Sequence, residues 1–414
     1  MLKLLAGYRV LESSQLLNGA STAAMLADLG ADVIKVESPF LGDYLRVEYT
    51  MHLHRQANKS KRSVAIDLRK PQGRDLFLRL LATADVFVTN AIANRNEKLG
   101  LSYAQLREHK PDIVYCQNTG FGASGPYREV PTHGQMMNAI AGSYPMELDA
   151  EGFTQPRADL LTRPGSYMGG GEATAVAATS AAFHIAAALA HRERTGEGCY
   201  IDISAAEAVI SSAWISAVAH MNIPETIGHH QSPENLRAVA RYQFYQAADG
   251  RFLLFCPEEK KFWETFCDLV GRPELKGIQF GVELRREIQA ILKTRTLAEW
   301  MQIAVQHKLP IGPAHIDIAD IRADPQIAAR GIFVDGRDET GAPFTYVGQP
   351  AQLAGQQFEV SRPAPRLGEH TDEILRGIGC SDADLARYAA EHVTTSPEFV
   401  TDHIAQNVFN THKG

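Results

Sequence analysis

Apolar runs alternate with amphipathic stretches along the first 120 residues of the chain. Apolar and β-branched residues predict strands at 8–13, 31–38, 62–68, 85–90 and 112–120. Periodic apolar positions predict helices at 21–30, 70–84 and 102–110. Strands and helices that alternate with short connections are typical of a parallel sheet covered on both faces, so the sequence predicts an α/β fold. Ligands of such sheets bind beyond the carboxyl ends of the strands.

A long apolar segment follows a run of glycines. From Ala173 to Leu189 the one residue that can become charged near neutral pH is His184, which predicts a helix that is packed on most of its sides. Gly169, Gly170 and Gly171 precede Glu172 and place its carboxylate in the first turn. An accessible carboxylate at a helix N-terminus can serve as a nucleophile, or it can simply be a favourable helix charge.

The pattern changes near residue 224. Two strands around a turn at Asp249-Gly250 predict a hairpin at 241–257. Amphipathic helices are predicted at 258–271 and 296–309. We therefore expect a large domain at 1–224, a small α+β domain at 225–330 and a return segment at 331–414.

Composition narrows the functional class. The chain is 45% apolar and 21% charged with a net charge of −7, which is typical of a soluble globular protein and gives no support for nucleic-acid binding. No membrane span is predicted, and residues 1–20 lack a secretory signal pattern, so we expect a cytoplasmic protein. The five cysteines are scattered without zinc-site spacing, so we expect no metal. The chain has no G-x-G-x-x-G after its first strand and no P-loop, which argues against a dinucleotide site of the usual type.

Six strings in order resemble one family. They are LADLGADVIKVESP, NKSKRSVAIDLRKPQGRDLFLRL, ADVFVTN, TGFGASGPY, HRERTGEGCYIDIS and PAPRLGEHTDEIL. Together they resemble the family III CoA-transferases of the CaiB/BaiF type, a superfamily that also holds the α-methylacyl-CoA racemases. The resemblance covers nearly the whole chain.

The resemblance implies a Rossmann-like large domain completed by the return segment, a smaller inserted domain and an interlocked dimer. It implies transfer of CoA from an acyl-CoA to a carboxylic acid through an aspartyl anhydride and an enzyme thioester. CoA thioesters are then substrates, and no cofactor is bound permanently. A homodimer is expected, with a heteromer of homologous subunits as the alternative.

The sequence departs from the family pattern at the nucleophile. Counting back without gaps from Gly196 places the family aspartate at Thr174, which cannot play this role. Glu172 stands two residues earlier, so we expect it to be the acyl-accepting carboxylate. Asp159, farther upstream, is the alternative.

Other site residues are carried over from the resemblance. It implies that Gln15 lines the acyl site and that Leu68, Arg69, Asn90 and Lys98 contact CoA. The two cations fit the negative charges of CoA.

His133 opens a second interpretation, because it stands where the racemases carry a catalytic histidine. A racemase needs an acid and a base on opposite faces of the α-carbon, and His133 with Glu172 could supply both. The third interpretation is a non-catalytic acyl-CoA-binding subunit of a heteromeric transferase. The sequence does not identify the acyl group or the acceptor acid.

Overall fold

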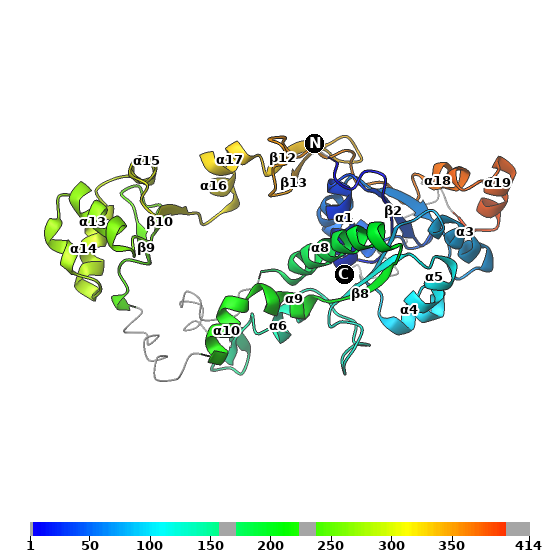
Figure 1. Cartoon of the computed structure of the whole chain (residues 1–414), viewed down its shortest axis with the longest axis horizontal. Coiled ribbons are helices and arrows are strands. Elements are labelled where there is room, and N and C mark those ends of the chain that lie inside the picture. The colour runs from blue at the N-terminus through cyan, green and yellow to red at the C-terminus, as the bar shows by residue number, and fades with distance from the viewer. Residues whose placement is uncertain (1–2, 157–170, 223–236, 395–414) are drawn as a thin grey trace. The chain divides into compact units, whose positions relative to one another are not determined.

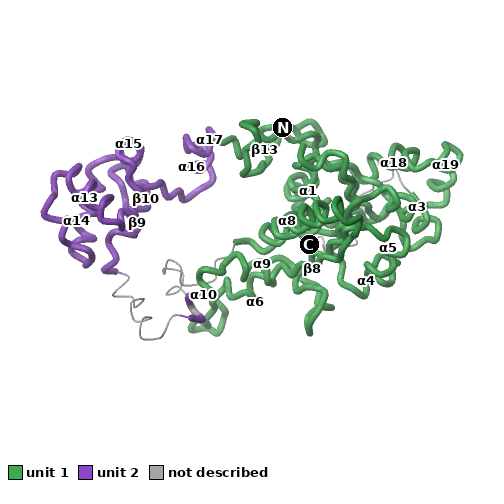
Figure 2. The backbone as a smooth tube through the Cα atoms, in the orientation of Figure 1, with its two compact units in different colours: residues 1–218, 330–414 green, residues 219–329 purple. Residues whose placement is uncertain are grey.

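The chain forms two compact units in the computed structural model, which describes residues 3–156, 171–222 and 237–394 (Figure 2). The first unit comprises residues 1–218 and 330–414, and the second comprises 219–329. The chain therefore leaves the first unit once and returns to it. Asp159 lies outside the described residues.

The first unit is built on a six-stranded parallel sheet with the order β3-β2-β1-β4-β5-β8. Its strands are β1 (Arg9–Ser13), β2 (Asp32–Glu37), β3 (Arg62–Ala65), β4 (Val86–Thr89), β5 (Val114–Thr119) and β8 (Cys199–Ser204). The predicted α/β fold and its five N-terminal strands are confirmed. The chain moves outward from β1 to β3 and then crosses to β4, so the strand order reverses between β1 and β4. A reversal of this kind leaves a crevice at the carboxyl ends of the two strands.

Helices cover both faces of this sheet (Figure 1). Val10, Val86 and Val114 face one core together with α1 (Asn18–Asp28), α8 (Ala173–Thr195) and α9 (Ala205–Ser212). The alternate strand positions face a second core, whose helices are α3 (Pro71–Leu81), α5 (Tyr103–His109), α18 (Thr371–Gly377) and α19 (Asp382–Ala390). Because successive side chains of a strand point to opposite faces, one apolar run supplies both cores.

Helix α8 differs from the sequence-based expectation, because only one of its faces is buried in this chain. Ala177, Ala181 and Ile185 pack against the sheet core, whereas Phe183 is 69% exposed. The lack of charge around the helix is therefore not explained by burial within one copy of the chain. By length and composition α8 could cross a membrane, but a helix that packs on a sheet core passes the same test.

The remaining elements before the second unit and in the return segment are short. They are α2 (Met51–Asn58), α4 (Ala93–Leu99), α6 (Met136–Ile140), α10 (Trp214–Asn222), the hairpin of β6 (Met146–Leu148) and β7 (Thr154–Pro156), the hairpin of β12 (Phe333–Arg337) and β13 (Pro343–Val347), and the 3-10 turns η1 (Tyr44–Arg46) and η2 (Glu48–Thr50). Two helices, α9 and α10, follow β8.

The second unit has its own antiparallel sheet and core. Its strands have the order β11-β10-β9, with β9 (Gln243–Gln246), β10 (Phe252–Phe255) and β11 (Ile311–Ala314). Its helices are α13 (Lys260–Leu269), η4 (Pro273–Gly277), α14 (Val282–Leu292), α15 (Leu297–His307), α16 (Ile318–Ala323) and α17 (Pro325–Arg330). The β9–β10 hairpin confirms the predicted turn, where Gly250 has φ +80°. Trp263, Phe266 and Trp300 form the centre of the core.

Candidate active site

A cavity of about 900 Å³ opens at the carboxyl ends of the parallel strands in the first unit. The loops that follow β1 and β4 both line it, so it lies where the strand order reverses. Seven of the residues singled out in the sequence line this one cavity, while the alternative carboxylate Asp159 lies outside the described residues. The seven are Gln15, Leu68, Arg69, Asn90, Lys98, His133 and Glu172. The structure therefore brings these sequence-predicted site residues together.

Gln15 and Asn90 hold the loops of the cavity to each other. The Asn90 side chain accepts the Gln15 N–H (3.0 Å) and donates to the Gln15 carbonyl (2.5 Å). The Gln15 side chain donates to the Gly42 carbonyl (3.0 Å) and accepts the Tyr44 N–H (3.1 Å). Both amides thus have a structural task in the unliganded protein, because they fix the loops after β1, β2 and β4.

A cluster of buried charged side chains holds the loop after β1 in place. Lys35 Nζ lies 2.7 Å from Glu12 and 2.9 Å from Asp43, and all three side chains are fully buried. Asp43 accepts the N–H of Leu16, which has φ +61°, in the left-handed region that a non-glycine residue seldom adopts. Lys61 lies 2.7 Å from the other oxygen of Glu12. The buried cluster therefore fixes an unfavourable backbone conformation at the cavity wall.

The buried cluster shifts the pKa values of its members. Burial would raise the pKa of Glu12, but Lys35 and Lys61 outweigh it and lower that pKa to about 2. Burial lowers the pKa of Lys61 to about 8, although Glu12 opposes the shift. For Lys35, attraction to Asp43 and Glu12 outweighs burial, and the pKa is raised. Sequence reasoning missed this cluster, and the only signal was a set of charged residues inside or beside predicted strands.

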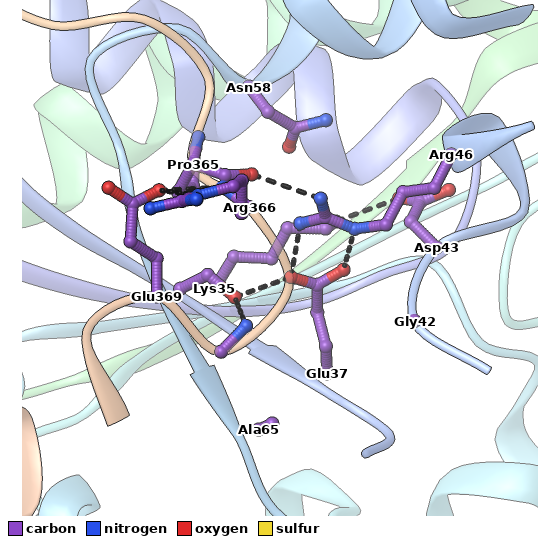
Figure 3. A network of polar contacts seen from close by, with 12 residues as sticks. Lys35, Glu37, Gly42, Asp43, Arg46, Asn58, Ala65, Pro365, Arg366 and Glu369 are labelled. Atoms are coloured by element: carbon purple, nitrogen blue, oxygen red, sulfur yellow. Dashed lines mark hydrogen bonds and ion pairs between the residues drawn. The ribbon is translucent and has the colours of Figure 1, made fainter. Parts of the chain in front are cut away.

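A second ion pair joins the return segment to the cavity (Figure 3). Arg46 binds Glu37 through two hydrogen bonds of 2.8 and 2.7 Å and donates to the Pro365 carbonyl (3.0 Å). Ser63 also donates to Glu37 (2.6 Å) and accepts the Gly368 N–H (2.9 Å). The last part of the chain thus stabilises the loops after β2 and β3.

Cations gather on the β3 and β4 side of the cavity. Arg69 is 68% exposed, is held by Asp67 (2.8 Å) and lies over the Phe40 ring. The hydrogen bonds from Arg69 are the main reason why the pKa of Asp67 is lowered. Arg95 and Lys98 are exposed on or beside α4 and line the same cavity. Leu68 is half-buried against the sheet core. This rim presents exposed cationic groups suited to a polyanionic ligand.

Glu172 is the N-cap residue of α8, one position before the first turn. Its carboxylate accepts the N–H groups of Thr174 (3.0 Å) and Ala175 (2.9 Å). The first N–H groups of a helix have no partner within the helix, so they stabilise an anion at this position. Gly171 has φ +89°, which explains why glycine precedes the carboxylate. Thr174, at the ungapped family position, is largely buried and also lines the cavity.

His133 and α6 form the wall beside Glu172. The His133 side chain is exposed, and no hydrogen bond joins it to Glu172 among the contacts of the described residues. Asn138 of α6 is buried, and its side chain makes hydrogen bonds to the backbone on both sides of Glu172. Sequence reasoning missed Asn138, because the contact spans more than 30 residues and no local pattern marks it.

Glycine is required at the end of β5 by close packing. A Cβ atom at Gly120 would lie 2.1 Å from the Thr132 hydroxyl oxygen. Asp202 of β8 accepts the Ala123 N–H (2.9 Å) and fixes the loop after β5.

The described residues contain no cluster of His, Cys, Asp and Glu that could hold a metal ion.

Comparison with known proteins identifies the family of this chain. Residues 5–371 match the family model of CoA-transferase family III. The chain is 30% identical over 403 residues to Succinate–glutarate CoA-transferase of Agrobacterium fabrum, covering 90% of this chain and 94% of the relative. It is 30% identical over 398 residues to Succinyl-CoA:mesaconate CoA-transferase of Haloarcula hispanica, covering 90% and 95%.

A solved structure shares the fold of this chain. Rv3272 from Mycobacterium tuberculosis superposes with a TM-score of 0.72 at 27% identity, covering 90% of this chain and 99% of that one. The chain therefore belongs to CoA-transferase family III, and it is a CoA-transferase.

Proposed function

We propose that Glu172 is the covalent nucleophile through which the protein moves CoA from an acyl-CoA to a carboxylic acid. One observation carries this proposal. Three carboxylates among the described residues line the cavity, and Arg46 holds Glu37 while Arg69 holds Asp67. Glu172 has no cationic partner among the ion pairs of the described residues and meets solvent at a helix N-terminus. It is thus the cavity carboxylate that is free to attack an electrophile.

The transfer takes four balanced steps. A Glu172 oxygen bonds to the thioester carbonyl carbon, the C–S bond breaks and CoA leaves as thiolate, which gives a mixed anhydride. The thiolate then attacks the glutamyl carbonyl, the donor acid leaves as carboxylate and a glutamyl thioester forms. The acceptor carboxylate attacks that thioester and expels CoA, and the thiolate finally attacks the acceptor acyl carbon. The Glu172 carboxylate is then regenerated, so no net proton, electron or water is consumed.

The helix N-terminus can support each tetrahedral intermediate. When one Glu172 oxygen turns toward the thioester, it leaves the N–H of Thr174 or Ala175 without its present acceptor. A developing oxyanion can take that place, and preorganised N–H donors of this kind typically contribute a hundredfold or more to rate. Water must be excluded while the anhydride exists, since hydrolysis would end the cycle.

The remaining expected residues divide between binding and support. Arg69 and Lys98 are proposed to contact the phosphates of CoA, because both are exposed cations on the cavity rim. Leu68 offers an apolar contact beside them. Gln15 and Asn90 are proposed to shape the acyl end mainly by holding its loops.

The relatives suggest the first substrates to test. One is named for succinate and glutarate and the other for succinyl-CoA and mesaconate, which are all dicarboxylic acids or their CoA esters. We therefore propose succinyl-CoA as donor and a short dicarboxylic acid as acceptor.

Trapping tests the nucleophile directly. The protein is incubated with succinyl-CoA, treated with hydroxylamine and digested, and the peptide that contains Glu172 is sequenced by mass spectrometry. We expect a hydroxamate on Glu172, and a loss of turnover of at least about a thousandfold in Glu172→Gln. Glu193→Gln, at the opposite end of the same helix and outside the cavity lining, is the matched control. A labelled wild type whose Glu172→Gln variant retains the label would exclude Glu172 as the nucleophile.

A racemase remains the second candidate, because His133 and Glu172 line the same cavity. Exchange of the α-proton with deuterated solvent, without exchange of CoA between acids, would favour it. CoA binding that is unaffected by Glu172→Ala, without either reaction, would favour a non-catalytic subunit.

We also propose that the chain functions as a homodimer. The exposed apolar side of α8, α9 and α10 includes Phe183, Trp214 and Ile215, each at least 60% exposed. Monomeric soluble proteins rarely expose so many large apolar side chains on one surface. Analytical ultracentrifugation is expected to give twice the chain mass. A mass of one chain would contradict the proposal, and co-purification of a homologous chain would instead favour a heteromer.

A further inference from the structure

Asn138 holds the backbone on both sides of Glu172. It lies in α6, is 4% exposed, accepts the Ala173 N–H at its Oδ1 (2.9 Å) and donates to the Gly171 carbonyl from its Nδ2 (2.8 Å). Gly171 and Ala173 are the residues directly before and after Glu172. One side chain from a distant segment therefore fixes both peptide groups that flank this carboxylate.

One of the two bonds satisfies a buried group that the helix cannot pair. Ala173 is fully buried, and its N–H belongs to the first turn, where helix geometry offers no acceptor. The next two N–H groups, of Thr174 and Ala175, are bound by the Glu172 carboxylate itself. Among these three N–H groups, that of Ala173 is therefore bound by Asn138, whereas the other two are bound by Glu172.

That difference matters once Glu172 reacts. Acylation moves a carboxylate oxygen away from the helix and weakens the cap that Glu172 provides. The contacts of Asn138 do not involve the carboxylate, so they persist through every intermediate. They also hold Gly171 in its left-handed conformation, which sets the direction in which Glu172 leaves the backbone.

We propose that Asn138 is a positioning residue that keeps Glu172 directed into the cavity while it is acylated and deacylated. The inference rests on the proposed function of Glu172. The same segment supplies cavity wall through His133 and Met137, so α6 couples the wall to the nucleophile.

The test compares Asn138→Ala and Asn138→Asp with a matched control. Gln289→Ala is that control, because the Gln289 amide makes the same pair of bonds to Gln246 (3.1 and 2.8 Å) in the second unit, outside the cavity lining. For each protein we would measure the single-turnover rate of hydroxylamine-trapped label on Glu172 with succinyl-CoA, KM, and the thermal midpoint. All rates are taken well below the lowest midpoint, so that loss of fold does not enter.

We expect Asn138→Ala to slow labelling by about ten- to a hundredfold, the typical effect of a misplacement near 1 Å, with KM changed less than about twofold. Asn138→Asp keeps the acceptor for Ala173 but loses the donor and adds a negative charge. It should therefore label slowly, and the acid limb of its pH–rate profile should move to higher pH. Gln289→Ala should label at the wild-type rate. If Asn138→Ala does not fold, Asn138→Asp supplies the measurement, because it still satisfies the buried N–H.

Two outcomes would overturn the inference, and they can be told apart. If both folded Asn138 variants label Glu172 at the wild-type rate, Asn138 is only structural and the proposed nucleophile stands. If the wild type gives no label on Glu172 although it transfers CoA, the proposed function fails and the positioning role fails with it.

Discussion

Replacing Lys35 by methionine would leave a buried carboxylate without a counter-ion. Lys35 bridges Glu12 and Asp43, and all three side chains are fully buried. After Lys35→Met, Glu12 still has Lys61 at 2.7 Å. Asp43 has no such substitute, because its Oδ2 atom has no hydrogen-bond donor among the described residues apart from its ion pair with Lys35. One uncompensated charge therefore remains in the interior.

The expected cost follows from that single charge. Removing one partner of a buried ion pair typically destabilises a protein by about 3–5 kcal/mol, since the remaining charge keeps its desolvation penalty. We expect this loss in the free energy of unfolding of the first unit. With tenfold per 1.4 kcal/mol, amide exchange of β1 and β2 should accelerate by about a hundredfold to several thousandfold. Hydrogen-exchange mass spectrometry resolves these peptides separately from the second unit.

A double variant distinguishes charge from packing. Adding Asp43→Asn to Lys35→Met removes the stranded charge but keeps an oxygen that can accept the N–H groups of Leu16 and Leu45. Exchange should then return most of the way to the wild-type rate. Lys110→Met, which breaks a half-buried pair with Asp112 at the surface, is the control and should cost less than about 1 kcal/mol. The reasoning is refuted if Lys35→Met changes exchange less than about fivefold, or if Asp43→Asn does not rescue it.

Three further predictions concern pH, packing and ligand charge. Burial would raise the pKa of Glu12, but Lys35 and Lys61 lower it from 4.5 to about 2. The ionised carboxylate therefore contributes about 3 kcal/mol to the free energy of unfolding above pH 4.5, and this contribution is lost as the pH falls toward 2. In urea titrations the destabilisation by Glu12→Gln should therefore shrink between about pH 5 and pH 2, and a constant difference would contradict this sign. Gly120→Ala should cost about 1–3 kcal/mol through its clash with Thr132, and Thr132→Gly in the same chain should restore the thermal midpoint. Arg69→Gln should raise KM for succinyl-CoA about tenfold at low salt with little change in kcat, whereas a KM unaffected by the substitution would remove Arg69 from the binding site.

The sequence predicts the strands of the first unit well because both of their faces are buried. Val10 and Leu11 point to opposite cores, and so do Val86 and Phe87, so each strand is a continuous apolar run that local pattern reveals. Strand order is not local, and nothing in the chain before residue 120 indicates that β8 pairs with β5. The family resemblance supplied Gln15 and Asn90 as site residues, and both line one cavity at the carboxyl ends of the parallel strands, where ligands of such sheets bind.

Long-range polar contacts were beyond sequence reasoning. The bond from Asn138 to Ala173 joins residues 35 positions apart, and the pair of Lys35 with Glu12 joins neighbouring strands whose register the sequence does not state. An apolar pattern reports that a position is buried, but a buried Lys or Asn looks the same in sequence as an exposed one. Helix α8 shows the converse limit, because its lack of charge predicted burial on most sides although only one of its faces is buried in this chain.

As the proposed nucleophile, Glu172 would have two tasks that oppose each other, and the geometry offers a way to reconcile them. A resting carboxylate bound by two N–H groups is stabilised, which by itself slows attack on a thioester. The same N–H groups, however, are available to the oxyanion once an oxygen of Glu172 departs, so stabilisation lost by the nucleophile can be regained in the tetrahedral intermediate. This exchange requires donors that stay in place while the carboxylate moves. Asn138 fixes the peptide groups on either side of Glu172 through contacts that do not involve the carboxylate oxygens, and it would thereby separate the stability of the helix start from the chemistry proposed for Glu172.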